Sequence, residues 1–360
     1  MKVLSIQNDK SETVFIFGAG ASYPDGVPLQ SGIIPAIFNE GDPQLKKSSA
    51  SKRIKSFLKS NFPCKDIFST LEEVFGFIDY FLVNNISLSK EWNVQTLHST
   101  KSDLTKIIHY LISKKTKRSD NFRTFWSVIN KHNKNIGVIT TNYDTLIDDA
   151  FDKIYSECLI DYCIDFINYR HPDAGIPFWW WIDPTKPTEM FNDVTPTRIK
   201  LVKIHGSLNW KYCDCCGQVG LTPWDHGINL KTNSYDSFIG KELSDCPFDN
   251  NKLSSLIQVP THLKTNNNYI FNKLYDEALY LICNAKSLVF IGYSFPEADV
   301  HIRALIKRGF RNNGKIFVIN KSSAKDLRHR YESLAKKVNY HQMPFENFVK
   351  SRLLLNILKS

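Results

Sequence analysis

Short apolar runs that end in small or polar residues recur along the chain and predict the buried strands of a parallel sheet. The first run is Val14–Phe17, and Gly18-Ala19-Gly20-Ala21-Ser22 follows it directly. Runs that are apolar at every position are typical of strands covered by helices on both faces. We expect this run to be the central strand, followed after the glycine loop by a helix from about Leu29 to Phe38.

Further runs of the same kind predict the rest of the sheet, and they are Ile136–Thr140, Lys200–Ile204, Ser287–Ile291 and Lys315–Asn320. Helical patterns accompany them over Thr145–Phe151, Phe271–Ala285, Glu297–Lys307 and Ser322–Lys337, and the stretch from Val338 to Lys359 predicts a short strand and a closing helix. This alternation indicates an α/β fold with a doubly wound, Rossmann-like parallel sheet. Polar residues that follow the runs are therefore candidates for a binding site.

Two stretches depart from the alternation and are interpreted as insertions. Residues 39–121 have a helical period, and Ser69-x-x-Glu72 has the pattern of a capping box. Residues 211–260 contain a cluster of cysteines and predict a small zinc-ribbon-like insertion. Between them, residues 161–196 are irregular and rich in proline, and we expect Trp179-Trp180-Trp181 in this loop to contribute to a pocket or an interface.

The composition is that of a folded protein, and it does not by itself indicate a function. Of the 360 residues 42% are hydrophobic and 23% are charged, as in folded proteins. Apolar runs are too short to span a membrane, and residues 1–12 lack the apolar core of a signal peptide, so we expect a cytoplasmic protein without membrane contact. The eight cysteines do not suggest a disulfide framework. Because the lysines are dispersed, the net charge of +10 is interpreted as a solvated surface, and nucleic-acid binding stays an alternative.

Polar residues at the ends of the first three runs form the candidate site. Gly18 and Gly20 would let the backbone turn and approach a pyrophosphate, although the third glycine of the dinucleotide fingerprint and the lysine of a P-loop are absent. Asn142 and Asp144 follow the second run, and His205 follows the third. An alternative is that Asn142 and Asp144 cap a helix and that the histidine is structural.

The cysteine cluster has the spacing of a metal site. Cys213-x-x-Cys216 followed by glycine is the knuckle of a zinc ribbon, and Cys246 lies 30 residues after Cys216. Asp249 stands where a fourth cysteine is expected. We predict one structural zinc ion on Cys213, Cys216, Cys246 and Asp249, with Cys215 or His226 as alternates to the aspartate; the alternative is a knuckle that has lost its metal.

Five blocks in this order resemble the NAD-binding core of the sirtuin superfamily, and they are Gly18–Ser22, Thr141–Asp144, His205–Ser207, Gly292–Ser294 and Ile319–Asn320. The stretches that begin His205-Gly206-Ser207 and Phe290-Ile291-Gly292 are similar to those of sirtuin-like proteins of bacterial anti-phage defence, which hydrolyse NAD⁺. Sirtuins have Asp-Phe-Arg after Gly-x-Pro, whereas Leu29-Gln30-Ser31 follows Pro28 here, and Thr141 replaces a glutamine. Both departures disfavour lysine deacylation.

The resemblance implies a single sirtuin-like domain over residues 1–360 with NAD⁺ as its substrate. It implies cofactor-binding roles for Gly18, Ala19, Gly20, Ser22, Thr141, Gly292, Ser294 and Asn320. Cleavage of the nicotinamide–ribose bond passes through an oxocarbenium-like state, and the cationic leaving group departs neutral without a strong acid. Asp144 would hold the nicotinamide amide, Asn142 would orient the ribose or the attacking water, and His205 would accept a proton.

We therefore expect an NAD⁺ hydrolase that releases nicotinamide and ADP-ribose and depletes NAD⁺ during anti-phage defence. The alternatives are an NAD-dependent deacylase or ADP-ribosyltransferase and a non-catalytic NAD or ADP-ribose sensor. Because no sensor domain is evident, we also expect control through a homo-oligomer or a separate protein. The resemblance suggests a HerA-type ATPase as that partner.

Overall fold

The computed structural model describes residues 11–38, 41–62, 69–115, 118–151, 158–167, 197–221, 228–230, 234–235, 245–258, 268–310, 314–335 and 337–359. The expectations for Trp179-Trp180-Trp181 and for His226 lie outside these residues.

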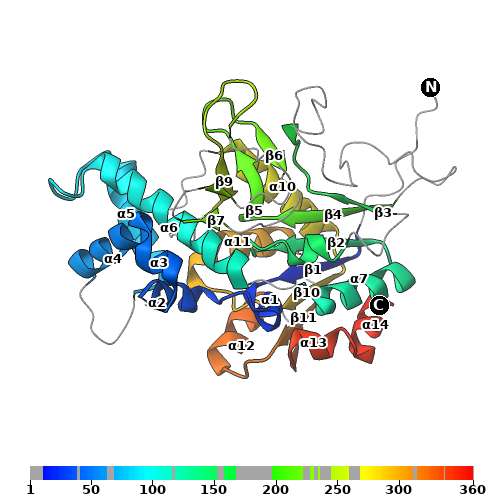
Figure 1. Ribbon diagram of the computed structural model, residues 1–360. Helices are drawn as coiled ribbons and strands as arrows, with labels where there is room; N and C mark the ends of the chain where they lie inside the picture. The colour runs from blue at the N-terminus through cyan, green and yellow to red at the C-terminus, as the bar shows by residue number, and fades with distance from the viewer. Residues whose placement is uncertain are drawn as a thin grey trace.

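A seven-stranded parallel sheet forms the centre of the molecule (Figure 1). Its order is β12-β11-β10-β1-β2-β4-β3, with bounds Val338–Gln342, Lys315–Asn320, Ser287–Ile291, Thr13–Phe17, Ile136–Thr140, Thr197–Lys203 and Cys158–Asp161. The predicted first strand is the central one, and all five of its residues are buried. The strand order reverses at β1, so the doubly wound Rossmann-like fold is confirmed.

Helices cover both faces of the sheet, as its apolar strands require. On one face, Phe15 and Phe17 of β1 place their ring centroids 5.0 and 5.3 Å from that of Phe125 in α7 (Asp120–His132). On the other face, α10 (Tyr269–Asn284) lies so close to β2 that a Cβ atom on Gly137 would come within 2.8 Å of the Leu281 side chain. The glycine is needed for this close approach.

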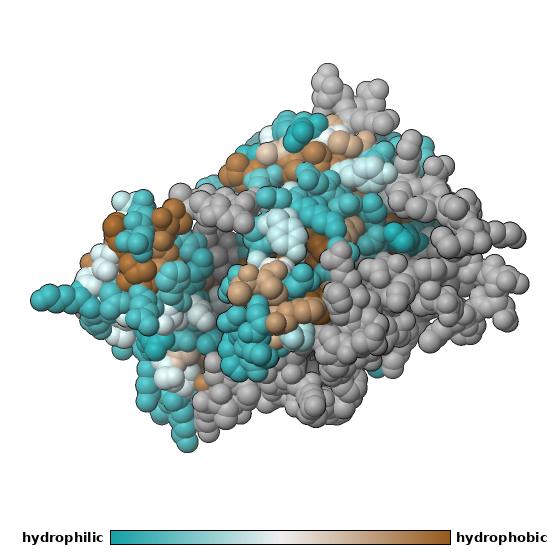
Figure 2. Space-filling view, turned by 90° about the horizontal axis from the view of Figure 1, so that it is seen from above, coloured by the Kyte–Doolittle hydropathy of each residue, from teal (hydrophilic) through white to brown (hydrophobic). Residues whose placement is uncertain are grey.

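The helical insertion lies at one end of the sheet (Figure 1). Its helices are α3, α4, α5 and α6, with bounds Pro43–Lys47, Ser49–Asn61, Leu71–Val83 and Val94–Lys115. The capping box lies one residue later than expected: Thr70 caps α5 and pairs with Glu73, not Ser69 with Glu72. Figure 2 shows apolar side chains over this region at the left of the molecule, where Tyr80, Val83 and Ile86 are exposed.

The third predicted strand ends earlier than expected. β4 stops at Lys203, and the chain turns through His205 into β5 (Gly206–Tyr212), which belongs to a separate antiparallel sheet with β6 (Val219–Leu221) and β9 (Ser254–Ile257). Gly206 has φ +78°, and a Cβ atom there would lie 2.0 Å from the carbonyl oxygen of Leu256. The turn that presents His205 therefore requires glycine at the next position. A two-stranded ribbon pairs β7 (Ile228–Asn229) with β8 (Ser234–Tyr235).

Several helices are shorter than the sequence pattern predicts. The segment expected as a glycine loop forms the helical turn α1 (Ala19–Ser22), which begins directly after Gly18, and two 3-10 helices (Tyr23–Asp25 and Gln30–Gly32) precede α2 (Ile33–Phe38). The remaining helices are α8, α11, α12, α13 and α14, with bounds Leu146–Asp149, Val300–Gly309, Lys325–Glu332, Phe345–Phe348 and Arg352–Leu358, and a 3-10 helix, Glu297–Asp299, precedes α11. Among the described residues, no helix combines the length and the apolar character needed to cross a membrane.

Candidate active site

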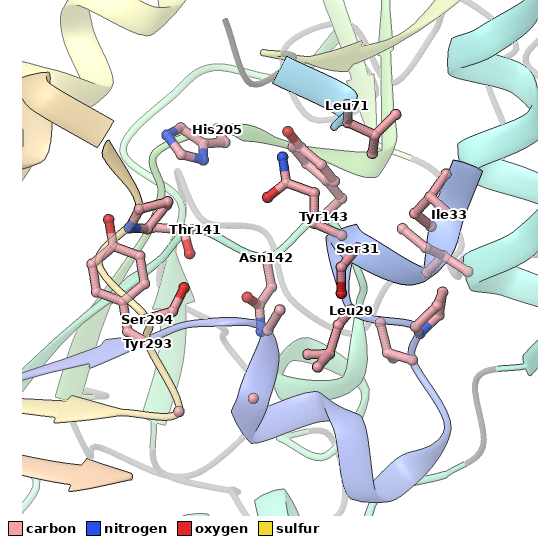
Figure 3. A pocket seen from close by; sticks show the side chains of 18 of the residues that line it. Leu29, Ser31, Ile33, Leu71, Thr141, Asn142, Tyr143, His205, Tyr293 and Ser294 are labelled. Carbon is pink, nitrogen blue, oxygen red and sulfur yellow. The ribbon is translucent and has the colours of Figure 1, made fainter. Parts of the chain in front are cut away.

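A cavity of about 580 Å³ opens at the carboxyl ends of β1, β2, β10 and β11, where ligands bind in doubly wound folds (Figure 3). Most of the site residues expected from the sequence line it: Ala19, Gly20, Thr141, Asn142, Asp144, His205, Gly292, Ser294 and Asn320. Gly18 and Ser22 are not among the lining residues, and Ser22 is fully buried. The two therefore lie behind the cavity wall.

The glycines of the first loop serve the packing of two loops against each other. The Gly18 and Gly20 amides donate to the carbonyl oxygens of Ile291 and Gly292 at 3.0 and 2.8 Å. A Cβ atom on Gly20 would lie 2.6 Å from the Gly292 oxygen, and one on Gly18 would lie 2.6 Å from Cα of Tyr293. The loops after β1 and β10 thus meet backbone to backbone, and this contact alone accounts for both glycines.

Asn142 lies at the centre of the site (Figure 3). Its Nδ2 donates to the carbonyl oxygen of Gly18 at 3.1 Å and to Oγ of Ser22 at 3.0 Å. Its Oδ1 is buried and accepts no hydrogen bond in the structure. A buried acceptor without a donor is costly, so this oxygen is available to a ligand hydroxyl or a water molecule in the cavity.

Asp144 is a buried carboxyl group that partly caps a helix. Its Oδ1 accepts from the backbone amide of Leu146 at 3.1 Å, so the capping role considered from the sequence is present. Burial raises its pKa to about 6, while the nearby ammonium group of Lys203 lowers it. Because the side chain also lines the cavity, capping and ligand contact are compatible.

Lys203 holds the backbone of this loop. Its Nζ donates to the carbonyl oxygen of Asp144 at 2.7 Å and lies 3.2 Å from the carboxylate of Asp148. The Lys203 and Asp148 side chains are completely buried, and Tyr162 adds a hydrogen bond to the Asp148 carboxylate at 2.9 Å. A buried, hydrogen-bonded ion pair of this kind fixes local geometry.

His205 belongs to a polar cluster that the sequence pattern did not reveal. Its Nε2 lies 2.9 Å from Nε2 of His301 and 3.6 Å from Oδ1 of Asp299. The Tyr293 hydroxyl donates to the other carboxylate oxygen of Asp299 at 2.6 Å. Asp299 and His301 both lie within the stretch predicted as a helix, Glu297–Lys307, where the helical pattern marked neither of them as a site residue.

The helical insertion supplies a wall of the cavity that was also not anticipated. Its residues come from the start of α5 with the two residues before it and from the C-terminal half of α6, and they are Ser69, Thr70, Leu71, Glu72, Ile108 and Ile112. Leu29 and Ile33 continue this wall from the segment after the glycine loop. The cavity is therefore polar near the strand ends and more apolar near the insertion.

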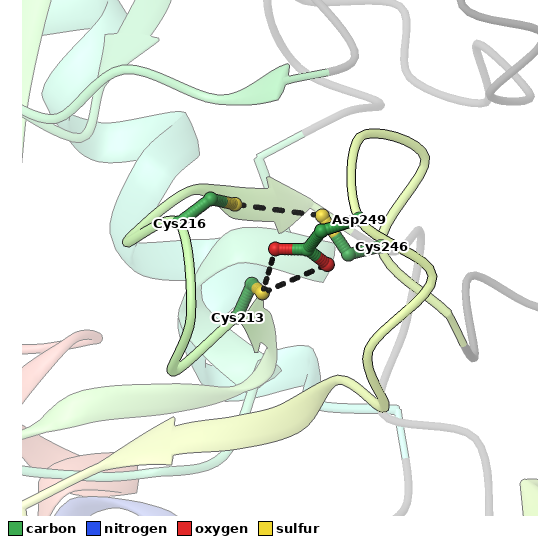
Figure 4. Close-up of side chains that lie close together, drawn as sticks. All are labelled: Cys213, Cys216, Cys246 and Asp249. Carbon is green, nitrogen blue, oxygen red and sulfur yellow. Dashed lines mark hydrogen bonds between the residues drawn. The ribbon is translucent and has the colours of Figure 1, made fainter.

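The cysteine cluster lies apart from the cavity, in the turns beside the small antiparallel sheet (Figure 4). Cys213 Sγ is 3.3 Å from Oδ2 of Asp249, and the Sγ atoms of Cys216 and Cys246 are 3.5 Å apart. One ligand atom from each of these residues lies within 4.8 Å of the others. Three sulfur atoms and a carboxylate converging in this way fit a closed tetrahedral zinc site.

Two backbone turns hold these ligands in place. The amides of Gly217 and Asn250 donate to the carbonyl oxygens of Cys213 and Cys246, each at 2.9 Å, so the two halves of the cluster have the same local pattern. Without a metal ion, burial raises the pKa of Cys216 to about 12, and the backbone amide of Asn251 holds the pKa of Asp249 below its usual value. A metal ion here would have to displace thiol protons.

Comparison with known proteins identifies the family. A serine-to-alanine mutant of a Sir2 homologue in complex with ADP-ribose is 13% identical to this chain, with coverage of 100% of this chain and 97% of the other and a TM-score of 0.46. A Sir2 homologue in complex with NAD is 12% identical, with coverage of 98% and 91% and a TM-score of 0.43. Comparison with curated proteins gives no match. The SIR2-like domain model matches residues 137–341, more than half of the 360 residues, and the chain therefore belongs to the SIR2-like domain family.

Proposed function

We propose that this protein is an NAD⁺ hydrolase that cleaves the nicotinamide–ribose bond and releases nicotinamide and ADP-ribose. The observation that carries the proposal is the buried, unpaired Oδ1 of Asn142, which shares one cavity with His205 at the carboxyl ends of the central strands. Membership of the SIR2-like family supports NAD⁺ as the ligand of this cavity.

The residues present fit a dinucleotide. The volume of about 580 Å³ lies within the usual range for ligand pockets. The backbone of Ala19, Gly20 and Gly292 borders the cavity where two loops meet, and would lie beside the pyrophosphate. Ser294 and Asn320, at later strand ends, would contact the adenosine ribose, and Thr141 borders the same side.

Hydrolysis of the nicotinamide–ribose bond requires that the substrate and the attacking water are positioned, and that one group accepts a proton. Water oxygen forms a bond to the anomeric carbon of the ribose as the bond to the nicotinamide nitrogen breaks, and nicotinamide leaves neutral with the bonding electrons. Asn142 Oδ1 would accept a hydrogen bond from the attacking water or a ribose hydroxyl, and His205 would take the proton that the water loses. Asp144 would accept hydrogen bonds from the nicotinamide amide, which fixes the leaving group.

One experiment separates this function from its alternatives. The purified chain is incubated with NAD⁺, with and without an acetyl-lysine peptide, and nicotinamide and ADP-ribose are measured by chromatography. Equal amounts of both products from NAD⁺ alone support the hydrolase. Nicotinamide that is released only with the peptide would indicate a deacylase, and NAD⁺ binding without cleavage would indicate a sensor.

We further propose a role as the cytoplasmic NAD⁺-depleting effector of a bacterial anti-phage system, controlled by self-assembly or by a partner such as a HerA-type ATPase. Support comes from the family resemblance and from the exposed Tyr80, Val83 and Ile86 on the helical insertion. The test measures NAD⁺ in infected cells that carry the gene with its genomic neighbour, and the mass of the assembly by light scattering. A monomer that leaves cellular NAD⁺ unchanged would contradict this role.

A further inference from the structure

Gln30 presents a buried amide nitrogen that has no hydrogen-bond partner in the structure. The residue begins the 3-10 helix Gln30–Gly32 and lines the cavity, and its Nε2 atom lies within hydrogen-bond distance of no acceptor. Its neighbours in sequence, Leu29 and Ser31, line the same cavity. A buried donor without an acceptor is costly, so this nitrogen is available to a group that enters the cavity.

The other side-chain amides of the cavity already use their nitrogen atoms. Nδ2 of Asn142 makes the two hydrogen bonds described above, and Nδ2 of Asn320 donates to the carbonyl oxygen of Tyr293 at 3.2 Å. Among the described residues that line the cavity, Gln30 is therefore the amide donor left for a ligand or a water molecule. The buried Oδ1 of Asn142 is the complementary acceptor, since it also has no partner.

The segment that carries Gln30 belongs to the nicotinamide end of the cavity. In Figure 3 Ser31 lies on one side of Asn142, and Ser294 lies on the other. Ser294 borders the part in which the adenosine ribose is expected, so the wall next to Ser31 borders the opposite end of the dinucleotide. Hydrolysis brings a water molecule to the anomeric carbon at this end.

A glutamine here suits a reaction with water. An enzyme that transfers ADP-ribose to another acceptor has to exclude water from the anomeric carbon, whereas a hydrolase has to hold it there. Gln30 stands where the Asp-Phe-Arg segment of sirtuins has its phenylalanine. An amide can hydrogen-bond a water molecule that an aromatic ring would exclude.

We propose that Gln30 is a positioning residue for the attacking water. Its Nε2 donates to one lone pair of the water oxygen, and Asn142 Oδ1 accepts one of the water hydrogens. The second lone pair forms the bond to the anomeric carbon as the bond to the nicotinamide nitrogen breaks. Nicotinamide leaves with the bonding electrons, and the other water proton passes to His205 as proposed above. This inference rests on the proposed hydrolysis of NAD⁺.

Two substitutions at this position test the kinetic role. Gln30→Met keeps the length of the side chain but removes the donor, and Gln30→Glu keeps the shape but offers a carboxylate that only accepts. Both should lower kcat about tenfold with little change in KM, as expected for the loss of one hydrogen bond. Gln95→Met and Gln95→Glu are the matched controls, because Gln95 is exposed on α6. A folded Gln30 variant with the kcat of the wild type would overturn the proposal.

The partition between two nucleophiles separates a contact with water from a contact with a ribose hydroxyl. In mixtures of methanol and water, the anomeric carbon gives the methyl riboside of ADP-ribose or ADP-ribose itself. Gln30→Met no longer holds the water, so the ratio of methanolysis to hydrolysis should rise about three- to tenfold. An unchanged ratio would overturn the proposal, and a raised KM beside it would assign the amide to a ribose hydroxyl.

A crystal structure of the full chain with an uncleavable analogue gives an answer that does not depend on activity. The analogue is NAD⁺ with a methylene group in place of the ring oxygen of the nicotinamide ribose, which prevents the oxocarbenium-like state. We expect one water molecule hydrogen-bonded to Gln30 Nε2 and Asn142 Oδ1. A ribose hydroxyl on Nε2 would refute the inference even if the chain hydrolyses NAD⁺, whereas the expected water without hydrolysis would refute only the proposed function.

Discussion

Asn142 Nδ2 donates a hydrogen bond to Ser22 Oγ at 3.0 Å, which joins the loop after β2 to the turn after β1. A second bond from the same nitrogen reaches the carbonyl oxygen of Gly18 at 3.1 Å. Because both acceptors are on the β1 side, the amide group has one orientation, with its oxygen left for the cavity. Ser22, for which the resemblance implied a cofactor-binding role, is better placed to orient Asn142.

Two substitutions separate the role of Asn142 from that of its hydrogen-bond partner Ser22. Asn142→Ala removes the oxygen, and we expect kcat for NAD⁺ cleavage to fall by about a hundred- to ten-thousandfold. Ser22→Ala leaves the bond to Gly18 in place and should lower kcat only about tenfold. Steady-state kinetics and NAD⁺ affinity test whether Asn142→Ala loses more kcat than Ser22→Ala. Both variants should first show the circular dichroism spectrum of the wild type, so that only folded proteins are compared. A larger loss in Ser22→Ala than in Asn142→Ala would contradict it.

His205→Ala should abolish hydrolysis while the fold and most of the NAD⁺ affinity remain. A general base contributes about a hundred- to ten-thousandfold in rate, whereas affinity should come mainly from pyrophosphate and adenosine contacts. Calorimetric titration with NAD⁺ and nicotinamide release give the two quantities. If the variant melts earlier but is fully active per folded molecule, His205 is structural and the sensor function becomes the better explanation.

Asp144→Asn should be more stable than the wild type at alkaline pH. Burial raises the pKa of Asp144 from 3.8 to about 6. The contribution of the uncharged Asp144 carboxyl group to the free energy of unfolding is therefore complete below about pH 4 and is lost as the pH rises through 6. The variant does not bury a charge, and its advantage in the free energy of unfolding should grow by about 1–2 kcal/mol between pH 5 and pH 8. Urea titrations of the wild type and the variant at pH 5 and at pH 8 measure this difference in the free energy of unfolding.

The activity of the same variant should move in the opposite direction. An amide in place of the carboxylate can accept one hydrogen bond but also presents a donor to the nicotinamide amide, and turnover should fall. Wild-type turnover should decrease as the pH falls below about 6, where the carboxyl group of Asp144 takes up a proton. A stability gain without a loss of activity would show that Asp144 does not contact the substrate.

The cysteine cluster should bind one zinc ion per chain. Cys213→Ser should lose the metal and unfold more readily, because a structural zinc ion stabilises the fold that holds it. Cys215→Ser is the matched control, since the exposed neighbour is not among the four converging ligands. Elemental analysis gives the stoichiometry.

Zinc affinity should also decrease with falling pH, since burial raises the pKa of Cys216 and Cys246 and their protons compete with the metal. Retention of zinc in Cys213→Ser together with its loss in Cys215→Ser would reassign the ligands. A reduced, chelator-free protein that contains far less than one zinc ion per chain would leave only a metal-free knuckle.

Breaking the buried ion pair between Lys203 and Asp148 should lower the free energy of unfolding. Lys203→Met leaves the Asp148 carboxylate without its counter-ion and removes the hydrogen bond to the Asp144 carbonyl, so we expect a loss of about 3–5 kcal/mol in unfolding free energy. Lys203→Met combined with Asp148→Leu should recover part of the loss. If the single substitution is neutral in denaturant titrations, the pair does not hold the loop.

The sequence indicated the fold well where strands are continuous apolar runs. The buried strands β1, β2, β10 and β11 begin and end within a residue or two of the predicted runs. The edge strand β3 was missed because Cys158–Asp161 is short and joins an irregular segment. The helix α7 was also missed, although Phe122, Phe125, Trp126 and Ile129 carry a clear helical period next to the insertion.

The site was predictable only where chemistry follows a strand end. Asn142, Asp144 and His205 do so, and the structure brings all three to one cavity. His301 occupies an ordinary helical position, and its contact with His205, 96 residues away, depends on how α11 packs. The wall from α5 and α6 likewise arises from the placement of the insertion, which sequence spacing does not encode.

The central position of β1 also determines when the protein can acquire its site during synthesis. Thr13 pairs with Ile136 on one side and with Ser287 on the other, so both neighbours of this strand are made long after it. The cavity further needs Gly292 and Asn320. Such distant pairings form slowly and late. A nascent chain on the ribosome therefore has no complete cavity until residues beyond Asn320 have emerged, and aborted translation products should be inert towards the nucleotide pool.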